Sequence, residues 1–291
     1  MDSINKRSYG QKLKAYKRSP LSLALFLLVL VSTILTIGIL LFLIGYIMIK
    51  GIPNIKPELF QWEYNTLNMS LMPALINTVI MTLISLLIAA PIGIFSAIYL
   101  VEYAKRGNRL IGIIRITAET LSGIPSIVYG LFGLLFFVTA LRWGMSLLAG
   151  AFTLSIMILP LIIRTSEEAL KAVPDSYREG SFGLGAGKLR TVFRIVLPSA
   201  MPGILAGVIL GIGRIVGESA ALIYTAGTVA EIPKGRDFLF DSTRTLSVHM
   251  YALTSEGLYV NQSYATAVIL LFIVVLINWF SGYIAKKLTK S

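Results

Sequence analysis

The sequence contains no cysteine among its 291 residues and only one histidine, His249. The absence of cysteine excludes disulfide scaffolds, thiol catalysis and cysteine-ligated zinc. A single histidine gives no basis for a histidine-rich metal centre or a Ser-His-Asp triad. Charged residues are also scarce, at 14% of the chain against about 25% in soluble domains, whereas 56% of the residues are hydrophobic. This composition is that of an integral membrane protein, for which lipid is the surrounding solvent.

Six apolar runs are long enough to cross ~30 Å of hydrocarbon, which takes about 20 helical residues. The first run has no charged residue and follows a basic flank, as a signal peptide would. It is too long for a signal peptide and no small-residue cleavage site closes it, so we expect it to be retained. We therefore predict an all-α polytopic membrane protein with six transmembrane helices and both termini on the same side. The runs are 21–49, 71–101, a segment within 110–141, a segment within 145–163, about 202–227 and about 264–284.

The basic residues lie mainly on one side of this layout. The tail 1–20, the loop 103–116, the loop 164–200 and the end 285–291 together carry 19 of the 26 lysines and arginines, and the opposite side carries six. The positive-inside rule assigns the richer side, and with it both termini, to the cytoplasm. The net charge of +12 thus reflects topology. Nucleic-acid binding is not expected, because no basic segment is interleaved with aromatic residues as a stacking groove requires.

A glycine-rich stretch, GLGAGKL at 183–189, does not match a phosphate-binding loop. Such a loop has four residues between its glycines and Ser or Thr after the lysine, but position 182 is Phe and Lys188 is followed by Leu189. The dinucleotide-binding pattern also fails on glycine spacing. The chain is therefore predicted to be non-catalytic, and any transport against a gradient must draw its energy from another subunit.

The long cytoplasmic loop has the pattern of a helix–turn–helix. A first helix should end before Pro174, because the residue before a proline is disfavoured in the helical region. Asp175 or Ser176 can cap the next helix, and after a glycine-rich turn a second, amphipathic helix is expected over 188–196, stopped by Pro198. Its apolar positions are Leu189, Val192, Phe193 and Val196. Two interpretations stay open: the loop docks in a groove of another protein, or it rests on lipid headgroups.

Two charged residues, Arg214 and Glu218, fall inside the fifth predicted span. If that span enters near Gly203, Arg214 lies about 16 Å deep, where an unpaired charge costs ~2.5–3.5 kcal/mol. The two are therefore expected on the face of a small-residue seam that packs on a neighbouring helix. The seam comprises Gly203, Gly207 and Gly211.

Two roles for this charged pair stay open. It could be an i, i+4 ion pair that fixes the rotation of the helix. Alternatively it is an anion site in a translocation path, with Arg214 as the donor to an oxyanion. Glu218 would then neutralise the arginine and could also accept a hydrogen bond from a protonated phosphate oxygen, which fully ionised sulfate lacks.

The long loop resembles the EAA signature of the permeases of ABC importers. The matching positions are Glu179, Gly180, Ser181, Gly185, Ile195, Leu197 and Pro198. The match departs where Gly180 and Ser181 replace two alanines, although both residues are small. The resemblance implies a type I, MetI-like permease fold. It also implies that this loop forms a coupling helix in a cleft of a separate ATPase, with Glu179 and Gly185 as coupling positions.

A narrower resemblance extends from about Asn77 to the end of the chain. The stretches ETLSGIPSIVYGLFGLLFF (from Glu119), LPLIIRTSEEALKAVPDSYREGS (from Leu159) and LGIGRIVGESAALIYTAG (from Leu210) are similar to the PstA family, the permease subunits of phosphate importers. Ser219 stands where that family commonly has Thr. The resemblance implies import of inorganic phosphate across the bacterial cytoplasmic membrane. It also implies a PstC-like second permease, two PstB-like ATPase subunits that use ATP and Mg, and an extracytoplasmic PstS-like binding protein; this chain itself is expected to bind no cofactor.

Three other positions allow further expectations. Arg164 and Glu167 (i, i+3) are either interfacial anchors or, as the resemblance implies, a charged cluster at the cytoplasmic mouth of the path. Glu119 is either a helix-start charge favoured by the helix dipole or a polar support beneath the turn that follows it. His249 is expected on the surface, facing a docked partner.

The chain is expected to divide into four parts: a cytoplasmic tail 1–20, a first helix 21–49, a permease core 72–284 that includes the coupling loop 164–200, and a cytoplasmic tail 285–291. Two other functions stay open. One is a permease for another oxyanion or small solute, and the other is a transporter that needs no ATPase.

Overall fold

The computed structural model describes residues 20–104, 109–255 and 257–289, and the regular elements within these ranges are helices. The chain divides into two compact units, Met1–Lys50 and Gly51–Ser291. In the described part of the first unit the chain forms one helix, α2 (Pro20–Gly51), whose side chains are exposed along nearly its whole length. This matches the first predicted span. The predicted cytoplasmic tail, apart from Pro20, and the basic residues Lys105, Arg106 and Lys290 lie outside the described residues.

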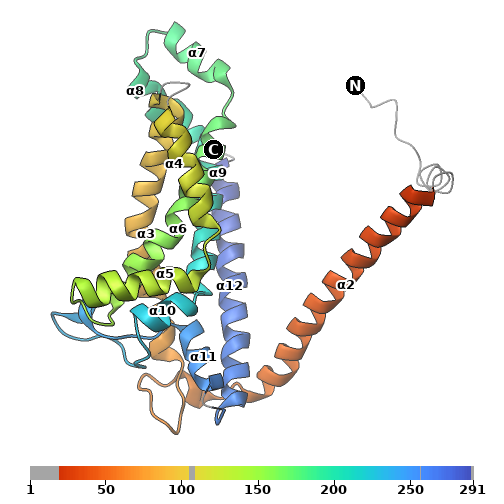
Figure 1. Ribbon diagram of the computed structural model, residues 1–291, viewed down its shortest axis with the longest axis vertical. Helices are drawn as coiled ribbons and strands as arrows, with labels where there is room; N and C mark the ends of the chain where they lie inside the picture. Colours follow the sequence, from red (N-terminus) through yellow and green to blue (C-terminus); the bar gives the residue numbers. More distant parts are fainter. Residues whose placement is uncertain (1–19, 105–108, 256, 290–291) are drawn as a thin grey trace. The chain divides into compact units, whose positions relative to one another are not determined.

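In the second unit, long helices run roughly side by side (Figure 1). They are α3 (Met72–Ile98), α4 (Arg109–Ser122), α6 (Leu147–Lys171), α9 (Leu197–Val216) and α12 (Val260–Thr289). Helix α6 is central and packs against α3, α4 and α9. The core between these helices consists of fully buried apolar side chains, among them Met81, Leu154, Ile158, Ile162 and Ile215. Because α6 has neighbours on several sides, some of its polar side chains, such as Thr153, Ser155 and Glu167, are buried within the bundle.

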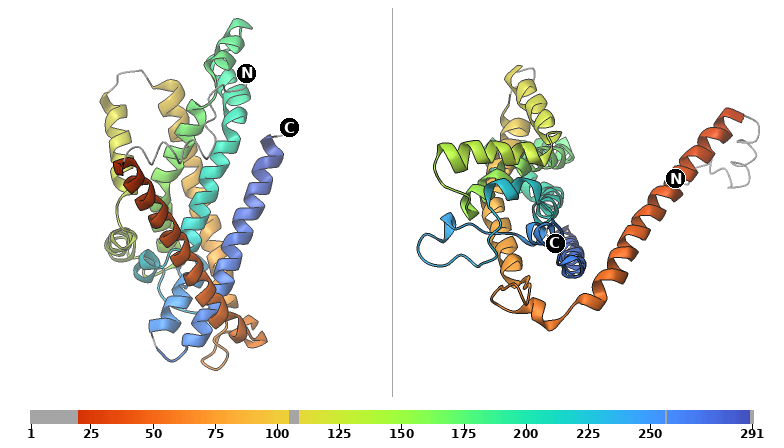
Figure 2. Two further views of the ribbon diagram at one scale, coloured as in Figure 1. Left: turned by 90° about the vertical axis from the view of Figure 1, so that its right-hand side faces the viewer. Right: turned by 60° about the horizontal axis from the view of Figure 1, so that its bottom comes forward.

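The third predicted span is not a single straight helix. Helix α4 and helix α5 (Ser126–Gly133), which continues in a π-helical turn Leu134–Ala140, meet at an angle of 101°. The chain turns because Pro125 disfavours a helical conformation in the residue before it and itself adopts an extended ψ of 141°. The Tyr129 hydroxyl donates a hydrogen bond of 2.7 Å to the carbonyl oxygen of Leu121, across the bend. As a result α5 lies across the long helices (Figures 1 and 2).

The fifth span begins earlier and ends earlier than predicted. Helix α8 (Lys188–Thr191), a π-helical turn (Val192–Val196) and α9 form one apolar helical segment that ends at Val216. The prediction that Pro198 stops a separate helix is wrong. Pro198 stands just after the π-helical turn, and a local π-helical adjustment can accommodate a proline inside a membrane helix. After Val216 the helix breaks, and α10 (Ala220–Thr225) lies across the bundle beside α5 (Figure 1).

The cytoplasmic loop and the last span largely follow the predictions. Helix α6 ends at Lys171, before Pro174. The next helix, α7 (Asp175–Gly183), has Pro174 itself at its N-cap and no side-chain cap, so the predicted capping by Asp175 or Ser176 is wrong. Helix α11 (Leu246–Ser255) precedes α12, which matches the sixth span. Among the described residues, five helices are long and apolar enough to cross a membrane, and the bent α4–α5 pair is the sixth candidate.

Candidate functional site

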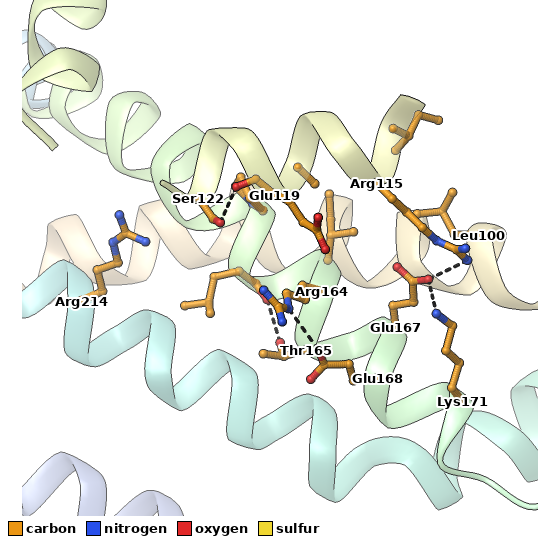
Figure 3. Close-up of a pocket in the computed structure, with 15 residues that line it drawn as sticks. Leu100, Arg115, Glu119, Ser122, Arg164, Thr165, Glu167, Glu168, Lys171 and Arg214 are labelled. Carbon is orange, nitrogen blue, oxygen red and sulfur yellow. Dashed lines mark hydrogen bonds and ion pairs between the residues drawn. The ribbon is translucent and has the colours of Figure 1, made fainter. Parts of the chain in front are cut away.

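A cavity of about 570 Å³ lies between α4, α6 and α9, beside the end of α3 (Figure 3). Four cations and three carboxylates line it. They are Arg115, Arg164, Lys171, Arg214, Glu119, Glu167 and Glu168. In a bundle of apolar helices, ionisable side chains gathered around a cavity make it a candidate site for a polar or charged solute.

Glu167 joins α6 to α4. Its Oε1 atom forms ion pairs with Arg115 Nη2 at 2.7 Å and with Lys171 Nζ at 2.6 Å, while Arg164 Nε donates to Glu168 Oε1 at 3.1 Å. Arg164 and Glu167 therefore have different ion-pair partners. Glu167 faces α4, and the residue one turn beyond Arg164 on its own face of the helix is Glu168. Both residues belong to a group of charged side chains from α4 and α6; that this group lies at the cytoplasmic mouth of a path stays a prediction.

Arg214 lies on α9, at the end of the cavity away from Lys171 (Figure 3). Within the part of the chain that the structure describes, no carboxylate forms an ion pair with it. The predicted pairing with Glu218 is wrong because Gly217 ends the helix between them. The buried carboxylate of Glu218 instead accepts a hydrogen bond of 3.1 Å from the backbone N–H of Ala221 at the start of α10. The backbone carbonyl oxygen of Glu218 accepts a hydrogen bond from the Ser247 hydroxyl.

Glu119 stands in the last turn of α4, so the prediction of a helix-start charge is wrong. Its carbonyl oxygen accepts a hydrogen bond of 2.7 Å from the Ser122 hydroxyl, immediately before the bend at Gly123. Its carboxylate points into the cavity on the side of Arg164 (Figure 3). Of the three described carboxylates in the cavity, this one has no ion-pair partner.

The glycine seam brings α9 against α6. A Cβ atom on Gly203 would lie 2.7 Å from the Cβ of Ala169, and one on Gly207 would overlap the Thr165 side chain. Gly211 is less crowded, with the Ile158 side chain 4.0 Å from such an atom. Two of the three glycines are therefore needed for the approach of the helices that carry Arg214 and the cavity residues of α6.

The predicted coupling positions lie on and after α7. Glu179 and Gly180 are exposed, whereas Ser181 is buried and its hydroxyl lies 2.8 Å from that of Thr191 in α8. Gly185 has a φ of +82°, a left-handed conformation that favours glycine. Ile195 and Leu197 are half-buried and Pro198 is exposed. The serine at 181 is thus explained by its contact with Thr191, and the glycine at 185 by its left-handed backbone conformation.

The apolar face predicted for 188–196 is divided in the structure. Val192 and Val196 are buried in a cluster with residues of α3 and α6, whereas Leu189 and Phe193 are exposed. Exposed apolar side chains continue onto the α7 hairpin, where Tyr177, Phe182 and Leu184 are 51%, 47% and 90% exposed. The exposed apolar surface therefore belongs to α7 and the turn after it as well as to α8.

The prediction that His249 lies on the surface is wrong. Its side chain is fully buried in α11, edge-on to the ring of Tyr64 with centroids 6.0 Å apart. The guanidinium of Arg244 lies 4.5 Å from the centre of the same ring. Burial and the charge of Arg244 lower the pKa of His249 to about 3, so the imidazole is neutral. This cluster lies away from the cavity and belongs to the packing of α11.

Three cavity residues were missed by sequence reasoning: Arg115, Glu168 and Lys171. The two on α6 could have been found, because Arg164, Glu168 and Lys171 follow at spacings of four and three and so share a helix face. Arg115 carries no such signal, since nothing in the sequence indicates that α4 faces α6 at this point.

The family model for the inner membrane component of binding-protein-dependent transport systems matches residues 89–290. The chain belongs to this permease family. The permease is 32% identical to the probable ABC transporter permease protein YqgI of Bacillus subtilis, over 87% of this chain and 92% of YqgI. It is 37% identical to the phosphate transport system permease protein PstA 2 of Mycobacterium bovis, over 72% of this chain and 71% of that protein.

The fold of the permease is also that of a solved ABC importer. A chain of the bacterial alginate ABC transporter, crystallised with its alginate pentasaccharide-bound periplasmic protein, superposes with a TM-score of 0.68 over 95% of this chain and 98% of that chain. Sequence identity is 16%, so this match concerns the fold alone. Membership of the family, and not this structural match, makes the permease a non-catalytic, multi-pass inner-membrane subunit of an ABC importer. The region shared with the family begins within α3.

Proposed function

We propose that this permease imports inorganic phosphate and that the charged cavity is part of its path. The main support for this proposal is the lack of an ion-pair partner for Arg214 among the described residues. The other three cations of the cavity are paired with carboxylates, and Arg214, among the described residues, is not. A guanidinium without a carboxylate partner presents a planar set of N–H donors, which matches the oxygens of a tetrahedral oxyanion.

The paired charges serve the release of the anion. Four unpaired cations in a low-dielectric cavity would hold a phosphate too tightly to pass it on, because Coulomb attraction strengthens as the effective dielectric falls. Glu167 and Glu168 form ion pairs with three of the cations and offset two of their three charges, so Arg214 is the one cavity cation that has no carboxylate partner among the described residues. This role replaces the one we first expected for Glu218, which caps α10 and does not line the cavity.

Glu119 is the carboxylate suited to distinguish phosphate from sulfate. Phosphate at neutral pH carries at least one proton that a carboxylate can accept in a hydrogen bond, whereas sulfate carries none. Glu119 faces the cavity and has no cation partner among the described residues. A bound sulfate would leave two anionic groups opposed, and buried like charges are strongly unfavourable.

Phosphate is favoured over other solutes by the relatives. PstA 2 of Mycobacterium bovis is named as a phosphate transport permease, and the EAA-like loop resembles importer permeases. The complex would contain a second permease, an ATPase dimer that uses ATP and Mg, and an extracytoplasmic binding protein, in the cytoplasmic membrane of a bacterium. The exposed apolar side chains of the α7 hairpin are suited to dock in the ATPase on the cytoplasmic side.

Uptake by the complete complex in proteoliposomes tests the path. Arg214→Gln should lower phosphate uptake by at least about tenfold, since a hydrogen bond to a charged group contributes ~1.5–3 kcal/mol, and Arg214→Lys should retain an intermediate rate. Arg236→Gln is the matched control, because it removes the same charge from an exposed outer position. Unchanged uptake by Arg214→Gln would rule out this path, and equal stimulation of ATP hydrolysis by sulfate or molybdate would rule out phosphate specificity.

The side and partner of the α7 hairpin can be tested with a single thiol. Leu184 is 90% exposed and the chain has no cysteine, so Leu184→Cys introduces a unique label site. We expect this position to cross-link to the ATPase in the purified complex and to resist impermeant maleimides added to intact cells. Labelling from outside would place α7 on the opposite side and contradict the proposal.

A further inference from the structure

The guanidinium of Arg178 connects α7 with two other helices. Its Nε and Nη2 atoms donate to Glu102 Oε1 at 3.1 and 2.7 Å. Nη2 also donates to the carbonyl oxygen of Leu170 at 3.0 Å, and Nη1 donates to the carbonyl oxygen of Val173 at 2.8 Å and to Asp175 Oδ1 at 3.2 Å. These five hydrogen bonds use all five N–H donors of an arginine.

Burial separates the strong contacts of Arg178 from the weak one. The Arg178 side chain is 14% exposed and that of Glu102 is 8% exposed, whereas that of Asp175 is 77% exposed. A buried ion pair with two hydrogen bonds is costly to break from one side, while an exposed pair contributes little. The contact with Glu102 is therefore the one that holds α7.

The partners of Arg178 lie at the ends of two core helices, on the side that we expect to face the cytoplasm. Glu102 belongs to the π-helical turn Tyr99–Tyr103 that ends α3, Leu170 lies in the last turn of α6, and Val173 follows that helix. A cation is favourable there, because the last carbonyl groups of a helix carry partial negative charge. Beneath the guanidinium, Leu170 and Val173 pack into one buried apolar cluster with Ala97 and Ile98 of α3.

The same end of α6 carries the cavity charges. Lys171 follows Leu170 directly, and Glu167 lies one turn earlier and holds Arg115 of α4. At the other end of α7, the buried hydroxyl contact between Ser181 and Thr191 fixes the helix to α8. Helix α7 is thus attached at both ends to the helices around the cavity, while its apolar side chains remain exposed.

We propose that Arg178 is a positioning residue that makes α7 move as one body with the ends of α3 and α6, and so transmits movement of α7 to the charged cavity. This role rests on the proposed function, in which an ATPase docks on α7. The docking surface consists of other side chains, so loss of the Arg178 contacts should leave docking intact and interrupt only the transmission.

The Arg178→Lys variant tests this role in the complete complex. Lysine keeps the charge but has only three donors, all on one nitrogen, so it can replace at most three of the five hydrogen bonds and lacks the fork that contacts Glu102 through two nitrogens. We expect the ATPase to co-purify as with the unmodified chain, and the ratio of phosphate imported to ATP hydrolysed to fall about tenfold, within the 5–150-fold range of typical coupling. Asp175→Asn is the matched control and should leave the ratio unchanged.

A removable cross-link separates coupling from folding. The chain has no cysteine, so Glu102→Cys together with Arg178→Cys provides a unique pair that a short bis-maleimide can join. The unlinked double variant should hydrolyse ATP with little uptake, and the linked one should regain most of the import per ATP.

Three results would overturn the proposal. The first is a normal ratio in Arg178→Lys or in the unlinked cysteine pair. The second is a linked pair that stays uncoupled. The third is a variant that loses ATPase binding, ATP hydrolysis and uptake in parallel, as a merely structural contact would. In contrast, failure of the unmodified chain to bind any ATPase would refute the proposed function itself.

Discussion

Gly207→Ala tests the contact that brings α9 against α6 beside the cavity. An added Cβ would overlap Oγ1 of Thr165 and lie 2.6 Å from its Cβ. Both Cβ atoms are fixed to the backbone, so a change of rotamer cannot relieve the contact and the helices must move apart. Overpacking of this kind costs ~1–3 kcal/mol.

A control on the same helix isolates the packing effect. Gly213 also lies in α9, but a Cβ there would have no atom within 4 Å. Replacing a helical glycine by alanine gains up to about 1 kcal/mol in helix propensity, and both variants share this gain. The free energy of unfolding of Gly207→Ala should therefore be lower than that of Gly213→Ala by about 1–3 kcal/mol.

A compensating change tests the named contact. Thr165→Gly moves the small residue from α9 to α6, so the double variant Thr165→Gly with Gly207→Ala should recover most of the lost stability. Contacting residues show interaction energies of ~0.5–3 kcal/mol in double-mutant cycles. Unfolding in detergent, followed by tryptophan fluorescence, measures these differences.

The outcome that refutes this reasoning is equal stability of Gly207→Ala and Gly213→Ala, which would mean that the helices do not approach at Gly207. A functional effect should accompany the loss of stability, because Thr165 also lines the cavity. Separation of the helices at this point would move Arg214 of α9 away from Arg164 of α6. The variant that loses more stability should therefore also lose more phosphate uptake.

Three further predictions concern single residues. Glu119→Gln should reduce the preference for phosphate over sulfate in stimulation of ATP hydrolysis, and an unchanged preference would exclude Glu119 as the discriminating group. The folded-state pKa of His249, about 3, lies below its ordinary value of 6.5. The free energy of unfolding should therefore be highest above pH 6.5 and should decrease below that pH by up to about 1.4 kcal/mol per pH unit, because the unfolded chain then binds a proton that the folded chain does not. The same slope in His249→Leu would contradict this. Gly185→Val should lose more bound ATPase than Gly185→Asn, because asparagine tolerates a φ of +82° better than a β-branched residue does; equal retention would remove the argument from backbone conformation.

The features that the sequence predicted well depend on local composition. The length of an apolar run decides whether a helix can cross the membrane, and Pro174 ends α6 through a steric effect on its own neighbour. Both are properties of contiguous residues, so no knowledge of packing was needed. For the same reason the family-like loop could be placed correctly as a helical hairpin around α7.

Prolines inside apolar runs could not be interpreted from their neighbours alone. Pro125 turns the chain between α4 and α5, whereas Pro198 is accommodated at the start of α9 and Pro91 lies inside α3. In a membrane the freed carbonyl groups must find other partners, and whether they do depends on the adjoining helices. Pro125 follows Gly123 closely, and this combination was the signal available for the bend.

The charged residues of the cavity show the limit of spacing arguments. Arg214 and Glu218 are four residues apart, but α9 ends between them, so the helical face that should have joined them does not exist. Glu167 finds its partner Arg115 on a different helix. Spacing identifies neighbours only within one unbroken helix, and a partner from elsewhere in the chain has no signature in a single sequence.

Helix α6 belongs both to the proposed phosphate path and to the proposed connection between α7 and the cavity. Its segment from Arg164 to Lys171 carries four of the seven charged side chains of the cavity over about 10 Å. The carbonyl oxygen of Leu170 within this segment accepts a hydrogen bond from Arg178 of α7. A displacement of α7 therefore acts on the helix that holds the ion pairs, without passing through an intervening loop. Because Glu167 is also paired with Arg115 of α4, such a displacement must either carry α4 along or break that pair. Breaking it would leave a second unpaired cation beside the path, which would strengthen anion binding at the end of the cavity nearest α7 and draw the anion from Arg214 toward it.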